Sequence, residues 1–111
     1  MRDLPRSLAF YCELLRLPRD ENRPDLGFPG AWLQIGEQQL HLMVLPNPDP
    51  VEGRPEHGGR DRHIAVSVLN LDGLAAQLDH ASIPYTRSRS GRQALFCRDP
   101  DGNALEFVQA S

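Results

Sequence analysis

The stretch Arg98-Asp99-Pro100-Asp101-Gly102-Asn103-Ala104-Leu105-Glu106-Phe107 carries the strongest fold signal in this chain. Its first half gathers Asp, Pro, Gly and Asn, the residue types that favour a tight turn. Its second half places Glu106 between the large apolar residues Leu105 and Phe107, which is typical of a strand with one buried face. We therefore predict a turn over residues 99–103 and a closing strand over residues 104–108, with the Glu106 carboxylate opposite Leu105 and Phe107.

The residues before this turn predict the rest of a β-α-β-β-β unit. A β-branched run predicts a strand over residues 63–69, and apolar residues at helical spacing predict a helix over residues 70–80. The apolar positions on one face of that helix are Leu71, Leu74, Ala75 and Leu78. Two further strands, expected at residues 83–86 and 93–98, complete the unit.

The first half of the chain predicts an α-β-β arrangement. A helix is expected to begin after the capping residue Asp3, as the second helix begins after Asn70. Its apolar side chains recur at helical spacing and are Leu4, Leu8, Tyr11 and Leu15. Residues 16–29 are rich in Pro and predict a loop with room for one further strand. Strands over residues 31–35 and 38–45 follow, joined by a tight turn.

The two halves align as an internal repeat of one βαβββ module. Asp3 aligns with Asn70 at an offset of 67 residues, and His41 aligns with Glu106 at an offset of 65. The offset of 67 places the counterpart of the strand at 63–69 at positions −4 to 2, so the first module is expected to be truncated and to lack its leading strand. The predicted organisation is one domain of residues 1–111, with a truncated first module (1–47), a Pro-rich linker (48–62) and a second module (63–111).

Three potential metal ligands lie on the predicted strands. Strand alternation turns His41, His63 and Glu106 away from the apolar side chains that flank them. Imidazole and carboxylate groups on one sheet face suit one divalent metal ion, and this ligand set does not choose among Zn, Ni, Fe(II) and Mn. Each residue also has a simpler interpretation, as a strand His that only makes hydrogen bonds or a strand Glu that faces solvent.

Two other residues are candidates for contact with a substrate. Trp32 lies opposite Leu33 on its strand, so it either lines a binding surface or fills the core. Arg92 belongs to a group of arginines around the turn at residues 88–91, the others being Arg87, Arg89 and Arg98. These arginines could bind an anionic group, or they could be the charged side chains of a solvated hairpin.

Composition excludes several classes of protein. A net charge of −3 disfavours a nucleic-acid surface, which needs clustered positive charge. No apolar run reaches the roughly 20 residues that cross a bilayer, and no basic-then-apolar leader opens the chain. Cys12 and Cys97 are far apart and form no CxxC pair, so we expect two reduced thiols in a cytoplasmic protein.

Several motifs together resemble the vicinal oxygen chelate superfamily, the group of glyoxalase I, fosfomycin and bleomycin resistance proteins and extradiol dioxygenases. The resemblance covers nearly the whole chain, and its most specific part is the Asp99–Phe107 ending at the expected distance from the strand that begins at His63. The other matching runs are Asp3–Tyr11, Gly30–Leu33, Gln39–Leu42 and Arg62–Val66.

The resemblance implies an α+β fold in which two βαβββ modules form an open, cup-shaped sheet. In metal-dependent members the ligands come from the first and last strands of each module. By this correspondence His63 matches the first-strand ligand of the second module and Glu106 matches its last-strand ligand. His41 matches the last-strand position of the first module, where glyoxalase I-like members more often carry Glu or Gln.

The function that the resemblance implies is a divalent-metal-dependent enzyme, of lyase or isomerase type, acting on a small substrate that binds the metal through adjacent oxygens. Glu106 would be its catalytic base, and a homodimer is expected because family members of this size commonly form one. Three alternatives stay open: a metal-independent, ligand-sequestering protein of the bleomycin-resistance type, an extradiol Fe(II) dioxygenase, and a folded but inactive remnant.

Overall fold

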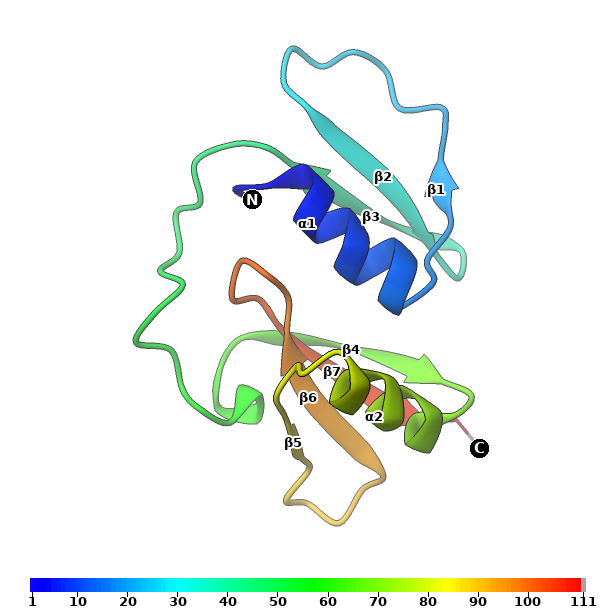
Figure 1. The fold of residues 1–111 in the computed structure, drawn as a ribbon, viewed down its shortest axis with the longest axis vertical. Helices are drawn as coiled ribbons and strands as arrows, with labels where there is room; N and C mark the ends of the chain where they lie inside the picture. Colours follow the sequence, from blue (N-terminus) through cyan, green and yellow to red (C-terminus); the bar gives the residue numbers. More distant parts are fainter. Residues whose placement is uncertain (111) are drawn as a thin grey trace. The chain divides into compact units, whose positions relative to one another are not determined.

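The computed structural model describes residues 1–110, and the chain divides into two compact units, Met1–Asp49 and the part from Pro50 onward (Figure 1). Each unit has its own sheet and its own helix. The fold is therefore α+β, as the sequence predicts, and each unit is described separately below.

The first unit opens with a helix that changes its pitch. Helix α1 (Leu4–Leu8) is followed directly by η1 (Ala9–Leu14), a π-helical turn in which hydrogen bonds span five residues. Asp3 caps α1, since its carboxylate accepts the backbone N–H of Arg6 at 3.2 Å. The cap position is therefore as predicted, whereas the π-helical turn is not.

The side chains that the first helix buries differ from the expected stripe. The expected stripe of Leu4, Leu8 and Leu15 is only half-buried, and the most buried side chains are Ser7, Phe10 and Tyr11. The rings of Phe10 and Tyr11 meet edge to face at 4.9 Å. Helical spacing alone therefore predicts that Tyr11 is buried but does not predict the burial of Phe10.

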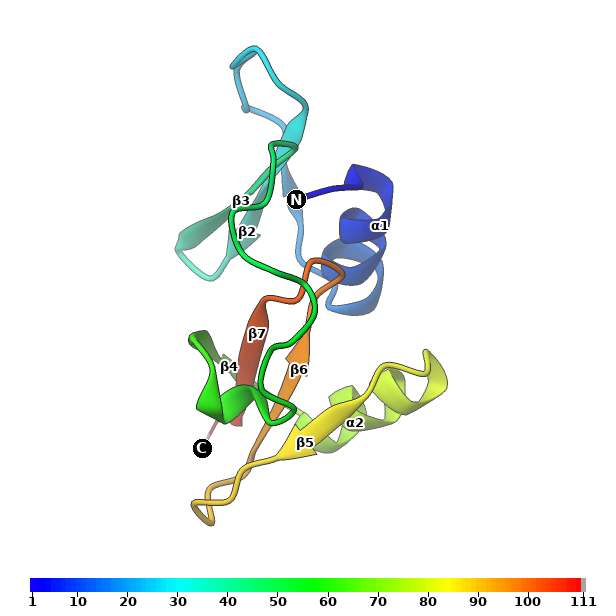
Figure 2. The same ribbon diagram turned by 90° about the vertical axis from the view of Figure 1, so that its left-hand side faces the viewer.

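The first unit's sheet is antiparallel, with the strand order β1-β2-β3. Strand β1 (Arg19–Asp20) lies in the predicted loop, and β2 (Gly30–Ile35) and β3 (Gln38–Met43) form the predicted hairpin (Figure 2). Alternation holds in this hairpin, because Leu33 and Leu42 are buried while Trp32 and His41 share the opposite face.

The second unit contains the complete βαβββ arrangement. Its strands are β4 (His63–Val68), β5 (Tyr85–Arg87), β6 (Ala94–Arg98) and β7 (Ala104–Gln109), in the spatial order β4-β7-β6-β5. Strand β4 runs parallel to β7, and the other pairs are antiparallel. Helix α2 (Leu71–His80) crosses over between β4 and β5. In the first unit, the strands β1, β2 and β3 correspond to β5, β6 and β7 of the second unit.

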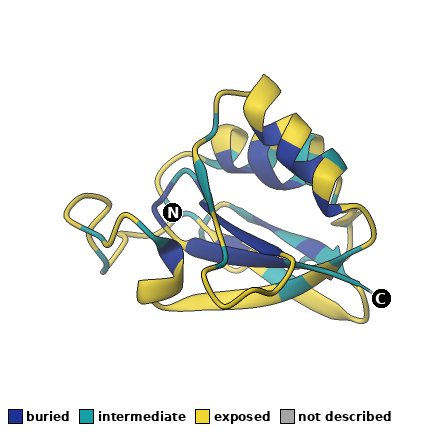
Figure 3. Cartoon of the chain, turned by 90° about the horizontal axis from the view of Figure 1, so that it is seen from below, coloured by how far each residue is buried: buried dark blue, intermediate teal, exposed yellow. Residues whose placement is uncertain are grey.

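Helix α2 covers one face of the second sheet. Asn70 caps it by accepting the backbone N–H of Gly73 at 2.9 Å, as predicted. Leu74 and Leu78 are buried on the side of α2 that faces the sheet, and its outer side is exposed (Figure 3). The opposite face of the sheet carries η2 (Gly58–Arg60), a short 3-10 turn whose Gly58 packs on Phe96 (Figure 2). That second face holds the candidate site.

Candidate functional site

His63 and Glu106 come together on the face of the second sheet opposite α2. The parallel register of β4 and β7 pairs Ala65 with Glu106, so His63 lies two residues away on the same face. The distance from His63 Nε2 to Glu106 Oε1 is 3.3 Å. Glu106 is 5% exposed, which is unusual for a carboxylate and requires polar partners.

The ring of His63 is fixed by two contacts. Its Nδ1–H donates to the backbone carbonyl of Asp61 at 2.8 Å, and a carbonyl oxygen can only accept. Its ring is nearly perpendicular to the ring of Phe96, with the two centroids 5.1 Å apart. The hydrogen therefore lies on Nδ1, and in the neutral ring the lone pair lies on Nε2, facing Glu106.

This donor pair fits a divalent metal ion. Two lone-pair atoms 3.3 Å apart repel each other unless a proton or a cation is bound between them. Donors of a four-coordinate ion, at bond lengths of about 2.0–2.2 Å, are also about 3.3 Å apart. The Nδ1–H···O=C bond is the usual way in which a protein presents Nε2 to a metal. His63 and Glu106 can therefore supply two ligands.

Arg92 also contacts Glu106. Its guanidinium group forms an ion pair with Oε2, the carboxylate oxygen that does not face His63. The Arg92 side chain is 57% exposed and belongs to the loop between β5 and β6. The structure thus brings the predicted substrate-binding arginine to the predicted base, and the guanidinium partly neutralises that base.

Arg98 is separate from the other arginines of the predicted cluster. It donates to Asp61 at 2.8 Å and to the backbone carbonyl of Gly102 at 2.7 Å. Arg98 therefore stabilises the turn before β7. Because its guanidinium is already bound to Asp61 and Gly102, the anion-binding interpretation does not apply to it.

His41 and Trp32 form a second pair, in the first unit. They are register partners on β3 and β2, and their rings stack at 4.4 Å with an angle of 9° between the planes. His41 Nε2 also lies 3.1 Å from Gln39 Oε1. Trp32 is half-buried on the face away from Leu33, which favours the exposed-wall interpretation over core filling.

Across residues 1–110 no three His, Cys, Asp or Glu side chains gather closely enough to hold a metal ion. The structure brings His63 together with Glu106, and Trp32 together with His41. The predicted three-ligand set of His41, His63 and Glu106 thus has two members in contact, and the third lies in the other unit.

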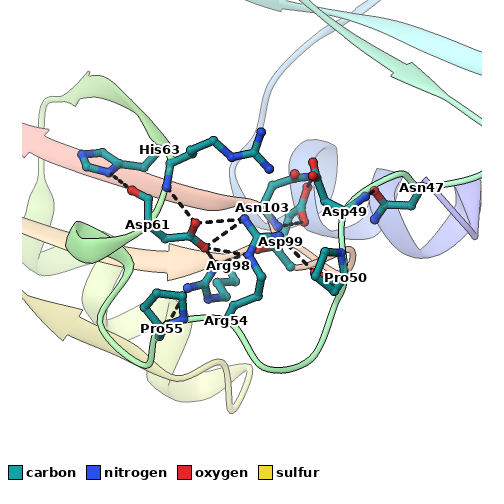
Figure 4. A network of polar contacts seen from close by, with 12 residues as sticks. Asn47, Asp49, Pro50, Arg54, Pro55, Asp61, His63, Arg98, Asp99 and Asn103 are labelled. Carbon is teal, nitrogen blue, oxygen red and sulfur yellow. Dashed lines mark hydrogen bonds and ion pairs between the residues drawn. The ribbon is translucent and has the colours of Figure 1, made fainter.

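The sequence does not predict the partners of Asp61. Its carboxylate accepts hydrogen bonds from Arg54 at 2.9 and 3.1 Å and from Arg98 at 2.8 Å (Figure 4). Arg54 first, and then Arg98, holds the pKa of the Asp61 carboxyl far below its ordinary value. The Asp61–Arg98 contact spans 37 residues, and no local spacing marks it.

His57 is a second residue that the sequence leaves without a role. Its Nδ1 is hydrogen-bonded to Thr86 Oγ1 at 2.6 Å, and its ring packs against the ring of Phe96 with the two centroids 4.9 Å apart. Phe96 therefore packs against both His57 and His63. A pocket of about 280 Å³ opens beside it, lined by Glu56, Gly58, Ile83, Pro84, Tyr85, Thr86, Phe96, Cys97 and Arg98.

Both cysteines are free thiols, as predicted. Burial raises the pKa of Cys97 to about 12, with a smaller contribution from the nearby Asp99 carboxylate. The pKa of Cys12 is also raised, chiefly by burial. None of the helices in residues 1–110 combines the length and the apolar character that crossing a membrane requires.

Comparison with known proteins identifies the family. The profile of the Glyoxalase/Bleomycin resistance protein/Dioxygenase superfamily matches residues 1–107, nearly the full chain. The chain belongs to this superfamily. The resemblance seen in the sequence motifs is thereby confirmed.

Two curated relatives carry glyoxalase names. "Glyoxylase I 4" of Arabidopsis thaliana is 28% identical over 96% of this chain, and the chain spans 64% of that relative's length, just under two thirds. A protein named as a probable lactoylglutathione lyase, from Synechocystis sp., is 25% identical over 98% of this chain and 88% of its own length.

Solved structures of the superfamily share the fold. A glyoxalase family protein from Bacillus anthracis superposes with a TM-score of 0.78 at 24% identity, covering 97% of this chain and 84% of that one. A lactoylglutathione lyase from Agrobacterium tumefaciens superposes with a TM-score of 0.65 at 23% identity, covering 99% and 87%. At these identities the likeness confirms the glyoxalase-like fold alone.

Proposed function

We propose that this glyoxalase-superfamily chain is a divalent-metal-dependent enzyme, of lyase or isomerase type, acting on a small substrate with two adjacent oxygens. One observation carries the proposal: His63 Nε2 and Glu106 Oε1 face each other at 3.3 Å on the face of the second sheet opposite α2, and the Nδ1–H of His63 is already hydrogen-bonded. The glyoxalase I and lactoylglutathione lyase names of the two curated relatives support the same class.

In this proposal His63 and Glu106 hold the metal, and His41 is the third ligand. A bound Zn, Ni, Fe or Mn ion would supply Lewis-acid stabilisation of the negative charge that develops on the substrate oxygens. The Nε2 of His41 would have to leave Gln39, its partner at 3.1 Å, before it could bind.

Glu106 is the proposed catalytic base. It would take a proton from the substrate carbon beside one oxygen and return it to the neighbouring carbon. Its burial excludes water from the carboxylate, which favours proton transfer to substrate over exchange with solvent. Arg92 would contact an anionic part of the substrate, and Trp32 would form an apolar wall.

A second candidate is supported by the contact between Arg92 and Glu106. This ion pair neutralises the carboxylate without a metal, so the same face could bind an organic ligand and carry out no reaction. In that case the function would be sequestration, as in the bleomycin-resistance branch of the superfamily. The two candidates differ in whether Glu106 is needed for a metal ion and for turnover.

An activity assay tests the first candidate. Metal-loaded protein is expected to form lactoylglutathione or a related 2-hydroxy acyl thioester, and Glu106→Gln is expected to lower kcat about 10²–10⁴-fold. Glu37→Gln is the matched control, because Glu37 is exposed in the turn between β2 and β3. Equal kcat values for Glu106→Gln and Glu37→Gln would exclude Glu106 as the base.

We also infer a homodimer in the cytoplasm. Strand β4 forms one edge of its four-stranded sheet, and Ile64 on that strand is 52% exposed. Edges of this kind are commonly covered by another chain. Light scattering at micromolar concentration is expected to give twice the mass of one chain, and a monomer mass would contradict the inference.

A further inference from the structure

The contacts around His63 extend outward to a group of charged residues that the proposed reaction does not use. The carbonyl that accepts the Nδ1–H of His63 belongs to Asp61, two residues earlier in the chain. The position of that carbonyl is therefore set by whatever holds Asp61. We name the three residues Arg54, Asp61 and Arg98 the Asp61 clamp (Figure 4).

The Asp61 clamp fixes Asp61 from two directions. Arg54 approaches with Nε and Nη2, at 2.9 and 3.1 Å, in the forked geometry that guanidinium and carboxylate favour. Arg98 approaches from β6 with Nη1 at 2.8 Å. The side chains are largely buried, with exposed fractions of 10% for Asp61, 11% for Arg54 and 23% for Arg98.

The clamp is in turn tied to the backbone around it. Arg98 donates to the carbonyl of Gly102, in the turn before β7, and to the carbonyl of Pro55. Arg54 donates to the carbonyl of Pro50 at 3.0 Å. The same three residues thus connect the segment before β4 with the turn that begins the strand of Glu106.

We propose that the Asp61 clamp is a positioning device for His63: it holds the Asp61 carbonyl where that carbonyl keeps the hydrogen on Nδ1 and turns Nε2 toward Glu106. The proposal rests on the proposed function for the claim that Nε2 binds a metal. The geometry of the ring itself stands without that claim. Asp61, Arg54 and Arg98 are positioning residues, and none of them touches the reacting atoms.

The tautomer of His63 is the first readout, measured on the metal-free chain. Free imidazole favours a hydrogen on Nε2, so a ring released from Asp61 is expected to populate that form. Nitrogen-15 shifts of the His side chains, assigned with His63→Gln, are expected to show the Nδ1–H form in the wild type and a mixture in Asp61→Asn. Asp79→Asn, which changes an exposed carboxylate on α2, is expected to match the wild type.

Metal affinity is the second readout, measured by calorimetry with Zn²⁺ or Ni²⁺. Loss of a group that orients a metal-bound His lowers affinity about 10–100-fold, which is the expected effect of Asp61→Asn. If Asp61→Asn does not fold, Arg54→Gln removes one guanidinium of the clamp and is measured in its place. A wild-type tautomer and wild-type affinity in the folded variant would overturn the proposal.

The two readouts separate this proposal from the proposed function. A tautomer shift in Asp61→Asn, in a chain whose wild type binds no metal, would support the positioning role and contradict the metal-dependent enzyme. Metal binding that is unchanged by Asp61→Asn, together with an unchanged ring, would contradict the positioning role and leave the enzyme supported.

Discussion

Glu106 contacts His63 and Arg92, which have opposite effects on the binding of a metal ion. His63 Nε2 offers a second donor to a metal ion, whereas Arg92 supplies a positive charge that competes with one. Glu106 is buried, but the Arg92 side chain is 57% exposed, so water competes for the guanidinium, and a divalent ion attracts the carboxylate more strongly than a single positive charge does. A divalent ion is therefore expected to displace the Arg92 guanidinium from Glu106.

Removal of Arg92 should strengthen metal binding. Arg92→Ala is expected to raise the affinity for Zn²⁺ or Ni²⁺ by about two- to fivefold, because the metal no longer displaces a guanidinium group. The same change is expected to raise KM for an anionic substrate. Calorimetry measures the first effect and steady-state kinetics the second. Arg89→Ala, on the same exposed loop, is the control and should change neither quantity.

Cys97 should make folding stability depend on pH in mildly alkaline solution. Its pKa is about 12 when folded and about 8.5 in an unfolded chain, so the folded state favours the protonated thiol. The stabilisation is complete below about pH 8.5 and declines as the pH rises from there toward 12, by at most about 1.4 kcal/mol per pH unit.

Urea unfolding at pH 8, 9 and 10 tests this expectation. The wild-type free energy of unfolding should fall over the series, and Cys97→Ala should be less stable at pH 8 but show a flatter decline. The chain has no lysine, so few other groups titrate in this range. Leu78→Ala, which removes a buried side chain that does not titrate, serves as the control. Parallel pH profiles for Cys97→Ala and the wild type would contradict the assignment.

At the scale of single elements, helix α2 depends on its N-cap. Asn70 accepts the N–H of Gly73 at 2.9 Å, and Asn70→Ala removes that acceptor. The expected loss is about 1 kcal/mol in the free energy of unfolding, measured by chemical denaturation. Gln77→Ala, on the exposed side of α2, should change stability by less than about 0.5 kcal/mol. Equal effects of the two substitutions would show that the cap does not stabilise the helix.

The elements of the second unit follow closely from local sequence signals. The cap at Asn70, the turn chemistry of residues 99–103 and the alternation around Glu106 each specify structure over a few residues. The closing strand was expected at 104–108 and is observed at Ala104–Gln109. The π-helical turn at Ala9–Leu14 could not be predicted in this way, because the apolar stripe of Leu4, Leu8, Tyr11 and Leu15 fits an ordinary α-helix equally well.

The candidate site was predictable only in part, for a similar reason. Strand alternation places His63 and Glu106 on faces that can meet, and their contact is present at 3.3 Å. The contacts of Asp61 with Arg98 and of Arg92 with Glu106 join residues on different segments through the tertiary fold. A single sequence carries no periodic signal for such pairs, so they emerge only from the structure.

At the scale of the whole molecule, the two units share an order of elements. Each unit contains a helix and an antiparallel three-stranded segment, and the second unit adds the parallel strand β4 that carries His63. The predicted ligands His41 and Glu106 occupy corresponding last strands, β3 and β7. Of the three predicted ligands, His63 and Glu106 are in contact within the second unit.

Metal stoichiometry is the most direct test of the metal-dependent function. Elemental analysis of protein purified without chelator is expected to find one Zn, Ni, Fe or Mn ion per chain in the wild type. His80→Ala, which changes an exposed residue at the end of α2, is the control and is expected to hold the same amount of metal. His63→Ala and Glu106→Ala, checked for folding, are expected to lose that metal. A folded wild type that holds no metal, and binds none when Zn²⁺, Ni²⁺, Fe²⁺ or Mn²⁺ is added, would contradict the metal-dependent enzyme.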